Sequence, residues 1–199
     1  MKILKNTEDF SIYTESELKN IARYGKTNEI KASAEMALIK RFPSEETLKN
    51  LARYGKTDDI AKAAFDALVD PSEETLKYLA EYGKTDEIAQ SAFDALADPS
   101  EKTLKYLARY GKTDEIKASA EMALIKRFPS EETLKCLAEY GKTDDIAKAA
   151  FDALVDPSEE TLKNLARYGK TDTIVQAAKD TLNKKFERIS HLIDIGRYS

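Results

Sequence analysis

PSEETLKNLARYGKTDDIAKAAFDALVD, residues 43–70, is the unit from which the rest of the chain is built. The same pattern returns at residues 71–98, 99–128, 129–156 and 157–182, and residues 14–42 carry it without the proline. The spacing is 28, 28, 30 and 28 residues between Pro43, Pro71, Pro99, Pro129 and Pro157. A period of this length is typical of solenoids, in which each repeat packs on its neighbours.

Each unit predicts two helices separated by a glycine turn. Asp70 ahead of Pro71 predicts an N-cap, with Glu73 three residues later as in a capping box. Gly83 stands where a left-handed C-terminal cap favours glycine, and Thr85 offers the N-cap of a second helix. Helices of about 11 to 13 residues are marginal in isolation, so we expect them to be stabilised by stacking.

The predicted fold is therefore all-α, a right-handed α-α superhelix (solenoid) of six two-helix repeats of 28–30 residues, forming one domain over residues 1–199. The predicted parts are an N-terminal cap at 1–13, repeats at 14–42, 43–70, 71–98, 99–128, 129–156 and 157–182, and a C-terminal cap at 183–199. Helical spacing predicts Ile189, Leu192 and Ile193 as the buried side of the C-terminal cap.

Composition narrows the functional classes. The chain has 42% hydrophobic and 34% charged residues. Its net charge of −4 disfavours nucleic-acid binding without excluding it. No run approaches the roughly 18 apolar residues of a membrane span, and the first residues lack the apolar run of a signal peptide, so we expect a cytoplasmic protein with no membrane partner. A single cysteine, Cys136, and a single histidine, His191, exclude a disulfide framework and make a metal site improbable, so no cofactor is expected.

Two segments resemble known α-solenoid repeats. TDDIAKAAFDAL, residues 57–68, resembles the second helix of HEAT-like repeats, whose period is similar, and this resemblance spans residues 14–182. PSEETLKYLA, residues 71–80, resembles the leucine-rich variant repeat, and the iron-sulfur cluster that this family can carry does not transfer to a chain with one cysteine. The resemblance implies a binding scaffold, and a minority of HEAT-like proteins bind DNA.

Three features recur in every repeat. Gly-Lys-Thr appears six times but lacks the upstream glycine and strand of a P-loop, which favours a turn between helices. We expect the tyrosine before each of these glycines to pack between helices, the alternative being a base-stacking track. The lysines are mostly followed by two acids, which favours helix-cap decoration over a phosphate track. The tyrosines are Tyr24, Tyr54, Tyr82, Tyr110, Tyr140 and Tyr168, and the lysines are Lys26, Lys56, Lys84, Lys112, Lys142 and Lys170.

The differences between near-identical copies point to a surface. Residues 18–86 and 104–172 differ at seven positions, and five of these fall at two positions of the unit, three residues apart on the first helix. These two positions share a helix face away from the leucine stripe. We take them as the candidate partner-binding residues: Asn20, Arg23, Asn50, Arg53, Tyr78, Glu81, Tyr106, Arg109, Cys136, Glu139, Asn164 and Arg167.

The leading interpretation is a non-catalytic scaffold that holds a protein or peptide partner on this face. One alternative is a single-stranded nucleic-acid binder reading about one base per repeat. Another is a designed or recently duplicated scaffold without an evolved partner. Exposed positions also vary simply because they tolerate change; against this, other first-helix positions never vary, namely Lys49, Lys77, Lys105, Lys135 and Lys163. No catalytic triad can be built from Cys136 and His191, so no enzymatic activity is expected.

Overall fold

The computed structural model describes residues 9–196, with side chains described up to His191. In this part of the chain twelve α-helices and one 3-10 helix, Phe10–Ile12, form, and no strand does. The first helices are α1 (Glu15–Tyr24), α3 (Glu45–Tyr54), α5 (Glu73–Tyr82), α7 (Glu101–Tyr110), α9 (Glu131–Tyr140) and α11 (Glu159–Tyr168). The second helices are α2 (Asn28–Arg41), α4 (Asp58–Asp66), α6 (Asp86–Asp94), α8 (Asp114–Arg127), α10 (Asp144–Asp152) and α12 (Asp172–Gly196). Each first helix packs against the second helix that follows it, which confirms an all-α solenoid of six two-helix repeats.

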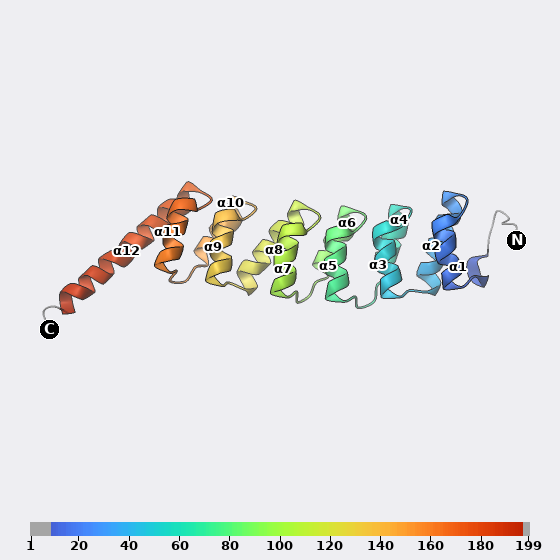
Figure 1. Cartoon of the computed structure of the whole chain (residues 1–199), viewed down its shortest axis with the longest axis horizontal. Coiled ribbons are helices and arrows are strands. Elements are labelled where there is room, and N and C mark those ends of the chain that lie inside the picture. The colour runs from blue at the N-terminus through green and yellow to red at the C-terminus, as the bar shows by residue number, and fades with distance from the viewer. Residues whose placement is uncertain (1–8, 197–199) are drawn as a thin grey trace. The chain divides into compact units, whose positions relative to one another are not determined.

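The helices group into two compact units. One comprises Met1–Pro99 and Gly111–Thr113, and the other Ser100–Tyr110 and Asp114–Ser199, so each contains three helix pairs. Within each unit the first helices lie in front of the second helices in the view of Figure 1. The single domain over residues 1–199 and the right-handed superhelix stay predictions.

Burial between the paired helices stabilises each repeat. In the second repeat Leu48 and Ala52 of α3, with Ala61 and Ala64 of α4, are at most 1% exposed. Burying a leucine contributes about 1.5–3 kcal/mol, and alanines let the two helix axes approach closely. The first helices, such as Glu73–Tyr82, have 10 residues, which is shorter than predicted and marginal for an isolated helix. These contacts therefore supply the stability that the short helices lack.

The helix N-termini correct one prediction and confirm another. Ser72, not Asp70, is the N-cap of α5, and its side chain accepts a hydrogen bond from the Thr75 N–H at 3.3 Å. Asp70 instead has a positive φ of 48° in the turn between repeats. Serine is the better cap because it directly precedes the first helical residue. Thr85 caps α6 as predicted and accepts from the Ile88 N–H at 3.2 Å.

The glycine after each first helix has a different role from the predicted left-handed cap. Gly83 has φ −48° and ψ 140°, a conformation open to any residue, and its N–H donates to the Leu79 carbonyl at 2.8 Å. A Cβ at this position would lie 2.7 Å from that same carbonyl oxygen. Glycine is required by this close approach and not by its backbone angles.

The second helices come in two lengths. The helices α4, α6 and α10 have 9 residues, whereas α2 and α8 have 14 and carry the buried residues Glu35 and Glu121. The Lys56 N–H donates to Glu35 Oε2 at 2.8 Å, and the Lys142 N–H donates to Glu121 Oε2 at 2.7 Å. In the third repeat the equivalent Lys84 N–H donates to a carbonyl of α3 at 3.1 Å. Burial raises the pKa of both glutamates. The long helices thus insert a carboxylate where other repeats use a direct backbone contact.

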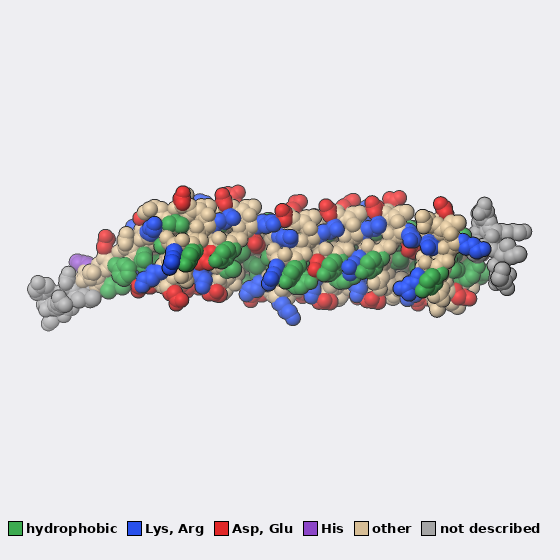
Figure 2. All heavy atoms as spheres, turned by 45° about the horizontal axis from the view of Figure 1, so that its top comes forward, with side chains coloured by type: hydrophobic (Ala, Val, Ile, Leu, Met, Phe, Trp, Pro, Cys, Tyr) green, Lys and Arg blue, Asp and Glu red, His purple; other side chains and the backbone are tan. Residues whose placement is uncertain are grey.

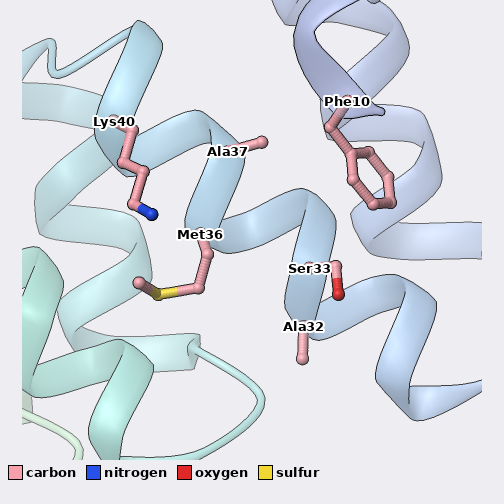
Figure 3. Close-up of a pocket in the computed structure, with 6 residues that line it drawn as sticks. All are labelled: Phe10, Ala32, Ser33, Met36, Ala37 and Lys40. Atoms are coloured by element: carbon pink, nitrogen blue, oxygen red, sulfur yellow. The ribbon is translucent and has the colours of Figure 1, made fainter. Parts of the chain in front are cut away.

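The predicted N-terminal cap, residues 1–13, is described from Asp9. Arg41 Nη1 donates to the carbonyls of Phe10 and Tyr13 at 2.6 and 2.8 Å, which ties this segment to α2. Residues 1–8 lie outside the described part. Figure 3 shows the Phe10 ring beside α2, where it borders a shallow hollow of about 370 Å³. The other residues that line this hollow are Ala32, Ser33, Met36, Ala37 and Lys40.

The predicted C-terminal cap is a direct continuation of α12. This helix has 25 residues and runs well beyond α11, which has 10. Ile189 is therefore 52% exposed, and the prediction that it is buried was wrong. Leu192 and Ile193 lie outside the described side chains. Across the described helices, none combines the length and apolar character needed to cross a membrane.

Candidate binding surface

None of the predicted partner-binding residues is buried. Six are exposed and six are half-buried, and all lie on the first helices. The exposed ones are Asn20, Arg23, Asn50, Arg109, Cys136 and Arg167, and the half-buried ones are Arg53, Tyr78, Glu81, Tyr106, Glu139 and Asn164. The two variable positions thus face solvent in every repeat, as their place off the leucine stripe indicates.

The repeated tyrosines join this surface, contrary to the expected interhelical packing. Their exposed fractions run from 39% at Tyr82 to 72% at Tyr24 and Tyr140. Each tyrosine is the last residue of its helix, four residues after the first variable position, so the two share a face. The sequence contained this signal in the four-residue spacing. We call the two variable positions and the terminal tyrosine of each first helix the first-helix strip, and Figure 2 shows hydrophobic side chains beside Lys and Arg side chains on a face of each unit.

In the first unit the strip contains an arginine surrounded by three aromatic rings. The Arg53 guanidinium carbon lies 4.5, 5.1 and 4.3 Å from the ring centroids of Tyr54, Tyr78 and Tyr82. Arg53 Nη1 also donates to the Tyr78 hydroxyl, and this hydrogen bond raises the pKa of Arg53. Tyr78 and Tyr82 contact each other with centroids 5.2 Å apart. These distances are within the range of cation–π contacts, so α3 and α5 hold a preorganised group that we call the Arg53 cluster.

The second unit replaces this cluster. Its equivalent positions hold Glu139 for Arg53 and Asn164 for Tyr78, while the tyrosines remain as Tyr140 and Tyr168. Arg167 lies over the Tyr168 ring at 5.0 Å. Charge is therefore reversed at two neighbouring positions, from Arg53 and Glu81 to Glu139 and Arg167.

Cys136 occupies the first variable position of α9. It is a free, exposed thiol, and desolvation by its surroundings, followed by the nearby Glu139 carboxylate, raises its pKa. A raised pKa keeps the group as a neutral thiol at neutral pH, which is the less reactive form. Cys136 therefore contributes a small apolar side chain to the strip.

Four of the six turn lysines form ion pairs with an aspartate of the preceding repeat. Lys142 Nζ lies 2.7 Å from Asp114, and its hydrogen bond lowers the pKa of that carboxyl. Longer ion pairs join Lys84 to Asp58 at 3.8 Å, Lys112 to Asp86 at 3.7 Å and Lys170 to Asp144 at 3.9 Å. At the position of Asp114 the first repeat has Asn28, which explains one of the seven differences between copies. The acids that face these lysines remove their attraction for a phosphate backbone.

The second unit carries a hollow at the position equivalent to the one on α2. On α8 a hollow of about 580 Å³ is lined by the same residue types as the one beside Phe10, together with side chains of α10.

In the described part of the chain no group of three His, Cys, Asp or Glu side chains is placed to hold a metal ion. No protein-family model, curated protein or solved structure matches the chain.

Proposed function

We propose that this protein is a non-catalytic scaffold that binds a protein or peptide partner along the first-helix strip of each unit. The observation that carries the proposal is that positions differing between near-identical repeats adjoin a row of exposed tyrosines. Tyrosine and arginine are enriched in protein interfaces, and the rigid tyrosine ring buries a large area with little loss of conformational entropy. HEAT-like identity and a cytoplasmic location belong to this proposal as predictions from the sequence.

A single-stranded nucleic-acid binder is the alternative. The exposure of the tyrosines favours it, because aromatic rings supply stacking platforms for bases. The pairing of the turn lysines with aspartates disfavours it, because few basic groups are left to neutralise phosphates. A duplicated scaffold with no evolved partner is the third possibility.

The test begins with capture of binding partners and their identification by mass spectrometry. Tyr78→Ala, Tyr106→Ala and Arg109→Ala are then measured against the purified partner. We expect a substitution at any of these residues that contacts the partner to weaken binding at least tenfold, as for interface hot spots. Unchanged binding by all three variants would sink the proposal. Fluorescence anisotropy with single-stranded RNA and DNA pools at two salt concentrations tests the alternative, which requires salt-sensitive binding at micromolar protein.

A further inference from the structure

Among the described residues of α9 and α11, Glu139 and Arg167 are two charges that form no close ion pair. The invariant lysines of these helices form ion pairs one turn away, Lys135 with Glu132 at 2.8 Å and Lys163 with Glu159 at 2.5 Å. The Glu139 carboxylate acts on the already paired Lys135 of its own helix only through its charge, and the Arg167 guanidinium lies over the ring of Tyr168. Opposite charges on neighbouring helices are thus available to a partner.

The spacing of these charges restricts the partner's backbone. The helices α9 and α11 are in contact, and packed helix axes lie about 8–10 Å apart. A polyproline II segment has three residues per turn and rises about 3.1 Å per residue, so side chains three residues apart lie on one side at roughly 9 Å. A β-strand does not match, because side chains three residues apart point to opposite faces.

The tyrosines supply the second half of the match. Tyr140 and Tyr168 end these same helices and are 72% and 52% exposed. Proline-rich segments in the polyproline II conformation dock on aromatic surfaces and are already ordered before binding, which reduces the entropy cost.

We propose that α9 and α11 bind a proline-rich, polyproline II segment with an arginine and an acidic residue three positions apart. The arginine pairs with Glu139, the acid pairs with Arg167, and the prolines contact Tyr140 and Tyr168. This inference rests on the proposed function and names the partner class for one part of the strip. In the first unit the equivalent Arg53 is held in the Arg53 cluster, so α3 and α5 present a different surface.

The test uses the full chain, labelled with ¹⁵N, titrated by NMR with the capped peptide Pro-Pro-Arg-Pro-Pro-Glu-Pro-Pro. Two peptides carry like charges instead, Arg-Pro-Pro-Arg and Glu-Pro-Pro-Glu in the same frame. We expect shifts of backbone amides in α9 and α11 and a Kd about fivefold or more below that of either like-charge peptide, the size of one or two exposed ion pairs.

Charge reversal in the protein must reverse the preference. Glu139→Arg leaves two arginines and should favour the Glu-Pro-Pro-Glu peptide, while Arg167→Glu leaves two acids and should favour Arg-Pro-Pro-Arg. Both new residues already occur at the equivalent positions of α3 and α5, so the fold accepts them. The matched control is Glu115→Arg on α8, which changes net charge equally and should not alter the order of the three peptides.

The inference is overturned if the peptide order is the same in both reversal variants, if the control changes it equally, or if no peptide binds at millimolar concentration. The proposed function is tested separately. It stands, even if this inference fails, when alanine at Tyr78, Tyr106 and Arg109 weakens binding of the captured partner. If the peptides fail these tests and the three alanine variants also bind the captured partner unchanged, both proposals are overturned.

Discussion

Substitution of Gly83 by alanine separates two effects of opposite sign. Gly83 has ordinary backbone angles, so alanine suits its φ and would stabilise the protein by about 0.4–1 kcal/mol through the unfolded state. The added Cβ would lie 2.7 Å from the Leu79 carbonyl oxygen, which already accepts the Gly83 N–H at 2.8 Å. If the backbone shifts to move the Cβ away from this oxygen, the hydrogen bond from the Gly83 position to Leu79, which ends α5, is strained.

The steric effect is the larger of the two. Overpacking costs about 1–3 kcal/mol, and weakening a backbone hydrogen bond adds about 0.5–1.5 kcal/mol. After the unfolded-state gain is subtracted, we expect Gly83→Ala to destabilise the protein by about 1–3 kcal/mol. For a chain of this size that corresponds to a Tm lower by about 2–12 °C.

Thermal unfolding followed by far-UV circular dichroism measures this change. Gly141→Ala is the matched second variant, because its Cβ would lie even closer, 2.5 Å from the Leu137 carbonyl oxygen. Its Tm should fall at least as far. A rise in Tm for either variant would refute the steric argument and restore backbone freedom as the reason for these glycines.

Four further substitutions, at three positions, test contacts between repeats. Glu35→Gln keeps an oxygen acceptor for the Lys56 N–H, whereas Glu35→Ala leaves that buried donor unpaired and should cost about 1–3 kcal/mol in urea unfolding. Burial raises the pKa of Glu35, so the ionised carboxylate is less stable in the folded than in the unfolded chain. The native protein therefore loses stability as pH rises through the raised pKa, and the stability of Glu35→Gln relative to the native protein should increase between pH 4 and pH 7. Glu45 accepts hydrogen bonds from Ser72, which lower its pKa to about 2. Glu45→Gln should therefore be less stable than the native protein above pH 4.5, and this difference should shrink as pH falls toward 2. A difference that does not depend on pH would contradict this. Asn28→Asp should add an ion pair to Lys56 and raise stability by about 0.2–1 kcal/mol at low salt, with the gain lost at 1 M salt.

The periodic features of the fold were predictable because they depend on local chemistry. Proline, glycine and threonine at fixed spacings predict two helices per repeat, and Thr85 caps α6 as expected. The identity of the first cap was missed because Asp70 and Ser72 are both good caps, and only the backbone direction of the turn decides between them. The glycine was correctly placed for a wrong reason, because its contact with a carbonyl is invisible in a sequence.

Features that depend on the neighbouring repeat were not predictable. The 30-residue repeats were visible in the spacing, but the burial of Glu35 and Glu121 against the next turn was not. For the candidate surface, helical spacing correctly placed the variable positions at the surface. It missed the terminal tyrosines, because an aromatic residue at a helix end suggests packing, and exposure depends on where the next helix lies.

The structure also gives a reason why some exposed positions do not vary between copies. Glu45 and Glu131 bond to the N-terminal serine of the next repeat, and the invariant first-helix lysines form ion pairs with glutamates one turn earlier. Such a residue cannot change without loss of its partner. Variation on the first-helix strip is not by itself a sign of binding, because strip residues such as Arg53 and Tyr78 also contact each other between repeats.

The distinguishing property of the strip is what remains after the framework contacts are satisfied. Every first helix ends in a tyrosine that stays 39–72% exposed, and exposed aromatic side chains of this size are enriched in binding surfaces. Tolerance of change does not explain why charge reverses together at two neighbouring positions, from Arg53 and Glu81 to Glu139 and Arg167. Neighbouring helices keep opposite charges in both copies, yet Glu139 forms no ion pair among the described residues. The proposed partner, in contact with both helices, would account for the constant tyrosines and for the paired reversal.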